Sequence, residues 1–130
     1  MTPRQPVTDR RSQLLKGVLD MCLLSIIAEE ASYGYEMVRK LDDRGLSLAS
    51  EGSIYPLLSR LQRAGLVEGY LVSSSEGPAR KYYRLADAGG AALEQWRNEW
   101  QALARSVDDV LDGMARSAPE ADEDGGGGRT

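Results

Sequence analysis

The chain has 130 residues, of which 42% are hydrophobic, with a net charge of −4, one cysteine and no histidine. This length accommodates one domain, and a single cysteine excludes an internal disulfide bond. Without histidine there is no Ser-His-Asp triad, no Cys-His pair and no histidine zinc site, and the sequence has no glycine-rich phosphate loop of the Walker type. We therefore expect a protein that is not an enzyme and that binds no metal or cofactor.

The distribution of apolar residues gives no indication of a membrane protein. No apolar run approaches the length needed to span a bilayer. Residues 1–13 are polar and basic and lack the apolar core of a signal peptide. We therefore expect a cytoplasmic protein with no membrane contact.

Charge is divided unevenly along the chain. Residues 1–85 hold 12 Lys and Arg against 10 Asp and Glu, whereas residues 86–130 hold 4 against 10. A basic first part beside an acidic second part fits a protein that binds nucleic acid through its first part only. Ordinary solvated surfaces are the alternative, and charge alone does not decide between the two.

Two helices are predicted after a flexible basic N-terminus of residues 1–11. Residues 12–29 form the first, since the apolar residues recur at steps of three and four. Cys22 lies in this stripe, which indicates a small buried side chain rather than a reactive thiol. The second helix follows Ser32, a good N-cap residue, and ends near Gly45, which favours left-handed backbone. The apolar face of the first helix consists of Leu15, Val18, Leu19, Cys22, Leu23, Ile26 and Ile27.

A third helix is predicted with Ser53 as its cap, Pro56 in its first turn and Gly65 at its end. Hydroxyl groups at a helix N-terminus suit phosphate contact, and arginine suits bidentate contact to guanine. Arg60 and Arg63 are therefore candidate DNA-binding residues, although an ordinary amphipathic surface helix has the same composition. The polar face of this helix offers Ser53, Tyr55, Ser59, Arg60, Gln62 and Arg63.

The periodicity then changes to that of a β-hairpin. Residues 66–73 and 80–85 predict two strands, separated by turn residues at 74–78. Basic residues on a hairpin beside a helix that reads DNA suit the adjacent minor groove and backbone. With the three helices, this hairpin predicts a winged helix-turn-helix domain over residues 12–86. The basic residues around its second strand are Arg80, Lys81 and Arg84.

The last predicted element is a long helix over residues 87–116, capped by Asp87. Its apolar residues alternate between steps of three and four, which is the heptad pattern of a helix that pairs with another helix. We therefore expect a mainly α-helical protein with a small β-hairpin, a winged helix-turn-helix followed by a long C-terminal dimerisation helix. Residues 117–130 are expected to be a disordered acidic, glycine-rich tail. The homodimer interface is assigned to Leu93, Trp96, Trp100, Leu103, Val107 and Val110.

Several strings of residues resemble the signature of the PadR family of transcriptional regulators. They are GSIYPLLSRLQRAGLVEG at 52–69, GPARKYYRL at 77–85, YGY at 33–35 and LLKG at 14–17. The resemblance covers about residues 12–112, and the single C-terminal helix is similar to that of the smaller subclass. It implies a dimeric DNA-binding regulator, usually a repressor, which in many members leaves DNA when a small molecule binds. The family usually has a threonine where this chain has Ala86, and Asp87 can take over the capping role.

The resemblance also assigns residues to a site. On matching positions it implies DNA contacts by Ser53, Tyr55, Arg80 and Lys81, with Lys16 near phosphate. A twofold dimer would place its two reading helices about 10 bp apart on a palindromic operator in double-stranded DNA.

Trp96 and Trp100 have two interpretations. They are either a packed dimer core or a site that sandwiches a planar small-molecule effector. The second is favoured by the resemblance, because some small members bind planar drugs between such aromatics. Two other classes of protein stay open: a winged-helix module that contacts protein or RNA, and an enzyme that uses carboxylates only, which nothing in the sequence supports.

Overall fold

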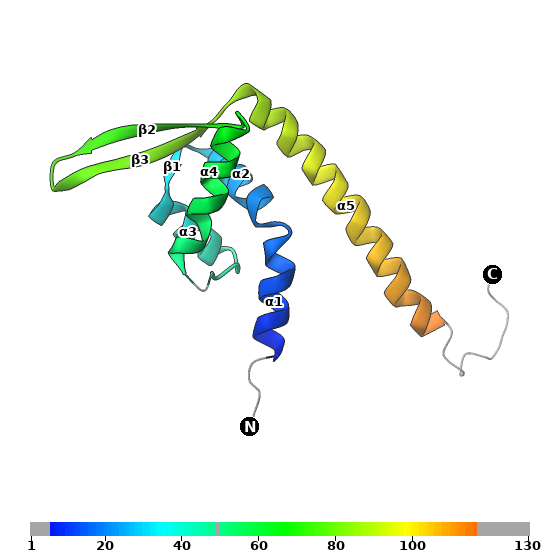
Figure 1. Cartoon of the computed structure of the whole chain (residues 1–130). Coiled ribbons are helices and arrows are strands. Elements are labelled where there is room, and N and C mark those ends of the chain that lie inside the picture. The colour runs from blue at the N-terminus through cyan, green and yellow to red at the C-terminus, as the bar shows by residue number, and fades with distance from the viewer. Residues whose placement is uncertain (1–5, 49, 117–130) are drawn as a thin grey trace. The chain divides into compact units, whose positions relative to one another are not determined.

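The structure, a computed structural model, describes residues 6–48 and 50–116, with side chains from Arg10 to Gly113 apart from Ala49 (Figure 1). The described residues up to Glu94 form one compact unit, and those from Gln95 form a second. The predicted tail at 117–130 lies outside the described residues. The elements are α1 (Pro6–Lys16), α2 (Leu19–Glu29), β1 (Ser32–Tyr33), α3 (Gly34–Asp43), a short 3-10 helix (Glu51–Ile54), α4 (Tyr55–Arg63), β2 (Val67–Ser74), β3 (Gly77–Leu85) and α5 (Asp87–Arg116).

The core of the first unit is formed by α2, α3 and α4, whose apolar faces meet beneath the sheet. This arrangement confirms the predicted fold class, a winged helix-turn-helix with a long C-terminal helix. The hairpin of β2 and β3 extends away from the helices and forms the wing (Figure 1). The buried apolar residues are Leu19, Leu23, Leu24, Ile26, Ile27, Met37, Leu41, Ile54, Leu58, Leu61, Val67 and Tyr83.

The single helix predicted over residues 12–29 is wrong, because the structure has two. After α1 ends at Lys16, the amides of Gly17 and Val18 bond three residues back, to Leu14 and Leu15. Glycine has low helix propensity, so the chain tightens there and then continues as α2. The apolar stripe continues across this break, which is why periodicity did not reveal it.

The start of α1 is also earlier than predicted. Residues 6–11, expected to be flexible, belong to the helix, and Pro6 begins it, where a missing N–H costs little. Cys22 is half-buried rather than buried. Burial raises the pKa of its thiol, and the Asp20 carboxylate raises it further, so the protonated thiol is favoured over the thiolate.

The sheet has one strand that the sequence did not predict. β1 pairs antiparallel with β3, so the strand order is β1-β3-β2. Ser32, predicted as a helix cap, lies in β1, where its buried hydroxyl donates to Glu30 O at 2.9 Å and accepts from Lys40 Nζ at 3.0 Å. The N-cap residue of α3 is Tyr33, whose amide donates to the Glu36 carboxylate at 3.2 Å.

The third predicted helix also begins differently from the prediction. Ser50, not Ser53, caps the turn by accepting the Gly52 amide at 2.9 Å, and a 3-10 helix precedes α4. The Ser53 hydroxyl donates to Ser50 O at 2.8 Å. Pro56 lies in the first turn of α4, as predicted. The helix ends predicted at Gly45 and Gly65 are confirmed by φ angles of +92° and +79°.

Helix α5 has the predicted bounds, and its first two turns belong to the first unit. The Ala86 amide donates to Leu66 O at 3.0 Å, and Gly89 is buried against the same carbonyl, which a Cβ at position 89 would overlap. Only glycine therefore lets the helix start this close to the base of the wing. No helix in the described part of the chain is long and apolar enough to cross a membrane.

Replacing Gly89 with alanine is expected to lower the free energy of unfolding by about 1–3 kcal/mol, because the new methyl group overlaps the Leu66 carbonyl. Gly90→Ala is the matched control, since a Cβ there meets only Leu85 Cδ2 at 3.7 Å. The control is expected to gain about 0.5–1 kcal/mol from helix propensity. Urea denaturation followed by circular dichroism measures both, and equal effects would contradict the close packing of α5 on Leu66.

Candidate nucleic-acid interface

All seven side chains predicted to bind DNA lie on the surface of the first unit. The buried Leu58 and Leu61 set the rotation of α4, so that its polar face points away from the core. The exposed predicted residues are Lys16 on α1, Ser53 on the 3-10 helix, Tyr55, Arg60 and Arg63 on α4, and Arg80 and Lys81 on β3.

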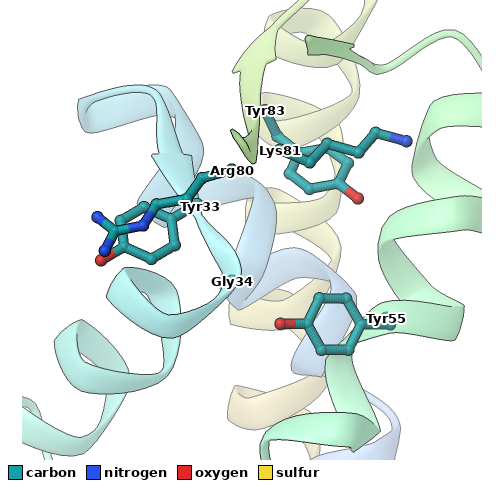
Figure 2. A pocket seen from close by; sticks show the side chains of 6 residues that line it. All are labelled: Tyr33, Gly34, Tyr55, Arg80, Lys81 and Tyr83. Atoms are coloured by element: carbon teal, nitrogen blue, oxygen red, sulfur yellow. The ribbon is translucent and has the colours of Figure 1, made fainter. Parts of the chain in front are cut away.

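The wing and α4 meet at a pocket of about 320 Å³, which we call the wing pocket (Figure 2). Three of the predicted residues line it together, so the fold brings α4 and the wing to one place. Lys16 and Ser53 line a second pocket, and Arg60 and Arg63 line neither of the two. The residues of the wing pocket are Tyr33, Gly34, Tyr55, Arg80, Lys81 and Tyr83.

Tyr55 is held in place from two sides. Its ring lies against Gly34, where a Cβ would come within 2.9 Å of two ring carbons. Its hydroxyl donates to Glu51, a carboxylate that the sequence analysis did not single out. This hydrogen bond, with a smaller effect from burial, raises the pKa of Tyr55 to about 12, so the phenol stays neutral. A phosphate that accepts from this hydroxyl would have to replace Glu51.

The two wing cations each lie over a tyrosine ring. The Arg80 guanidinium carbon is 4.7 Å from the centre of the Tyr33 ring, and Lys81 Nζ is 5.4 Å from that of Tyr83 (Figure 2). Such cation–π contacts are favourable by about 0.5–1 kcal/mol at exposed sites. Because successive residues of a strand project to opposite faces, the wing presents one cation on each face.

Arg84, the third basic residue of the wing, has a different environment. Its guanidinium forms an ion pair with Glu68 at 2.8 Å and lies 4.7 Å from the centre of the Tyr70 ring. This pairing raises the pKa of Arg84. Within the described ranges 6–48 and 50–116 the other ion pairs join Lys40 to Glu30 and Arg44 to Glu29. None of them uses a predicted DNA-binding cation, so among the described side chains no carboxylate neutralises those charges.

A row of tyrosines on the outer face of the sheet was missed by sequence reasoning. Tyr33, Tyr82 and Tyr70 are neighbours across the three strands, with ring centres 5.2 Å and 6.0 Å apart. Arg80 and Arg84 lie over the two ends of this row. The alternation Arg80, Tyr82, Arg84 in β3 is the sequence signal for a shared face, but the unpredicted β1 supplies Tyr33.

These features define a class of protein: a winged helix-turn-helix with a basic wing next to its recognition helix. Residues 23–95 match the model of the Transcriptional regulator PadR-like family. The chain belongs to this family and is therefore a DNA-binding transcriptional regulator, a class distinct from enzymes.

Two solved structures and one curated relative support the assignment. A PadR-like regulator of Bacillus cereus is 48% identical, with a TM-score of 0.67 over 76% of this chain and 96% of its own. A PadR family regulator of Eggerthella lenta is 32% identical, with a TM-score of 0.74 over 81% and 91%. The transcriptional regulator Rv3488 of Mycobacterium tuberculosis is 35% identical over 106 residues, 79% of this chain and 92% of that protein.

Arg80→Ala and Lys81→Ala are each expected to weaken binding to any duplex and to flatten its salt dependence. Each lost phosphate contact should lower the slope of log K against log salt by about 0.9. Fluorescence anisotropy with a labelled duplex at a series of NaCl concentrations measures the slope.

The control is the double variant Glu68→Gln with Arg84→Gln, which removes an ion pair without changing net charge and should keep the slope. A slope that is unchanged by both single substitutions would refute the assignment of the wing cations.

Proposed function

We propose that the chain is a repressor that binds a palindromic operator in double-stranded DNA as a homodimer and leaves it when a small-molecule effector binds. The observation that carries this proposal is the wing pocket, where Tyr55 of α4 meets Arg80 and Lys81 of β3. A recognition helix and a basic hairpin that converge there can contact one groove and the phosphates beside it simultaneously.

The dimensions of α4 fit the major groove. An α-helix with its side chains is about 10–12 Å in diameter, and the major groove is about 12 Å wide, so the nine-residue α4 can lie in it. Arg60 and Arg63 are exposed on it and would contact base edges or phosphate. The wing would then lie over the adjacent minor groove, with Ser53 and Lys16 near the sugar-phosphate backbone.

The homodimer is supported by the apolar stripe of α5. Leu103, Val107 and Val110 are 59%, 46% and 75% exposed, and Trp100 is 45% exposed. Leu93 and Trp96 are half-buried. A continuous exposed apolar stripe of this length usually marks an interface, and its heptad spacing fits a second copy of the same helix. Twofold pairing would give the operator its dyad symmetry, and a dimer bound at a promoter would exclude the transcription machinery.

Selection of bound duplexes from a random pool tests the function and the dimer together. The full chain should enrich dyad-symmetric sequences with half-sites about 10 bp apart. Leu103→Glu should give a monomer in sedimentation and bind the selected duplex about 100-fold more weakly, because the two half-sites are no longer linked.

Asn98→Glu is the matched control, since it adds the same charge at an exposed position outside the stripe. Enrichment of no sequence would overturn the proposal. An unmodified chain that sediments as a monomer at micromolar concentration would overturn the dimer.

The effector is proposed to be a planar molecule bound at the dimer axis between the Trp96 rings, with Trp100 lining the same space. An indole face is a favourable partner for a flat aromatic ring. Binding there would alter the crossing of the two α5 helices and thereby the separation of the recognition helices, so DNA affinity would fall without any contact between ligand and DNA. The alternative, a closed aromatic core, would exclude a ligand.

Tryptophan fluorescence distinguishes a ligand site from a closed core. Acridine, added without DNA, should quench the emission of Trp100→Phe saturably, since Trp96 is then the remaining indole. The same titration of Trp96→Ala should give only the weak, linear quenching of a collisional process. Linear quenching of both variants would rule out the pocket.

A further inference from the structure

A second pocket, of about 340 Å³, lies between α1, the start of α2, the loop after α3 and the 3-10 helix. Its volume is in the range of about 300–1,000 Å³ typical of small-molecule sites. We call it the leucine pocket, because its apolar lining consists of three leucines. The pocket is lined by Leu15, Leu19 and Leu48 together with Arg11, Ser12, Lys16, Ser47 and Ser53.

The walls of the leucine pocket are tied together by hydrogen bonds. Arg11 donates to Gly45 O at 2.8 Å and so links α1 to the loop. Within the loop the Ser47 hydroxyl donates to Asp42, and within the 3-10 turn the Ser53 hydroxyl donates to Ser50 O. These bonds hold α1, the loop and the 3-10 helix in place, so we expect binding to require little rearrangement.

The lining specifies the chemistry of an occupant. The three leucines give an aliphatic surface, and Leu19 is buried. Among the described residues, two cations, Arg11 and Lys16, line the pocket, and no carboxylate does. In the described part of the chain, the ion pairs leave the Lys16 ammonium without a carboxylate partner. An apolar chain that ends in an anion matches both parts of this lining, because the chain covers leucine while the anion meets lysine.

We propose that the leucine pocket binds a medium-chain alkyl carboxylate, with its hydrocarbon on the leucines and its carboxylate at Lys16. This ligand differs in chemistry and position from the planar effector proposed at Trp96, since the lining of the leucine pocket contains no aromatic side chain.

The position of the pocket gives binding a regulatory consequence, which rests on the proposed function. Lys16 and Ser53, both predicted to lie near DNA phosphate, line the pocket. A bound carboxylate would neutralise Lys16 and place a negative charge where the DNA backbone would approach. Alkyl carboxylate and DNA would therefore compete for the same surface of the protein.

Octanoate titrated into the full-length chain tests the proposal directly. Calorimetry should give saturable binding with a dissociation constant of about 1 mM or tighter, as expected for a ligand of this size. In heteronuclear spectra the amides of Leu15, Leu19 and Leu48 should shift most. Octanol, which lacks the charge, should bind about tenfold more weakly.

Two substitutions locate the site. Lys16→Ala should weaken octanoate binding about tenfold while leaving octanol binding unchanged. Leu48→Asp, which introduces a carboxylate at a half-buried position, should weaken binding of both probes. Arg10→Ala is the matched control, since this exposed cation of α1 does not line the pocket and should bind octanoate as the unmodified chain does.

The outcomes separate the pocket from the proposed function. The proposed site would be overturned if neither Lys16→Ala nor Leu48→Asp changed the affinity for octanoate. It would also be overturned if the largest chemical-shift changes lay around Trp96. Saturable octanoate binding that both variants weaken supports the proposed site. If the chain then binds no duplex, the proposed function fails and the octanoate site remains supported. If duplex binding is established, octanoate should reduce it, and the reduction should be lost in Lys16→Ala.

Discussion

The contact between the Tyr55 ring and Gly34 is the constraint on which the DNA-facing surface depends. Because position 34 has no side chain, the ring reaches the first turn of α3 and fixes the start of α4 relative to it. The same two residues form one side of the wing pocket, beneath β3. A single aromatic ring thus joins the second and third elements of the helix-turn-helix to the wing, and Glu51 holds its hydroxyl from the other side. This contact adds to the apolar core that α2, α3 and α4 share, and it sets the position of Tyr55 relative to the wing.

Sequence reasoning succeeded where a pattern repeats. The bounds of α5 and the exposed polar face of α4 followed from spacing, because a pattern that repeats over several helical turns averages out the exceptions. It failed where structure depends on one or two residues. β1 has only Ser32 and Tyr33, too few to show any alternation, and its existence depends on pairing with β3, about 50 residues later. The cap at Ser50 rather than Ser53 could not be distinguished, since either hydroxyl has the required chemistry.

For the candidate DNA-binding site, too, the sequence predicted some features and not others. Exposure of the seven predicted residues followed from the amphipathic pattern of α1, α4 and the hairpin. Their environments did not, because each depends on a partner distant in sequence. Arg84 resembles Arg80 and Lys81 in composition, yet Glu68, 16 residues earlier, pairs with it. The Tyr33 ring beneath Arg80 comes from the other end of the domain. No local pattern ranks three neighbouring cations by their availability to a phosphate.

The stacking of Arg80 on Tyr33 has an entropic consequence. Immobilising an arginine side chain costs up to about 2 kcal/mol in lost rotamer freedom. For an arginine side chain that no ring holds, this loss of entropy opposes DNA binding. For Arg80, part of the loss has already occurred during folding. The guanidinium can keep its place on the ring while its outer edge meets a phosphate, since a cation–π contact uses the face of the group and hydrogen bonds use its rim. The tyrosine row of the sheet therefore orders Arg80 in advance, and part of the entropy cost of holding this side chain against a phosphate is removed before the duplex is encountered.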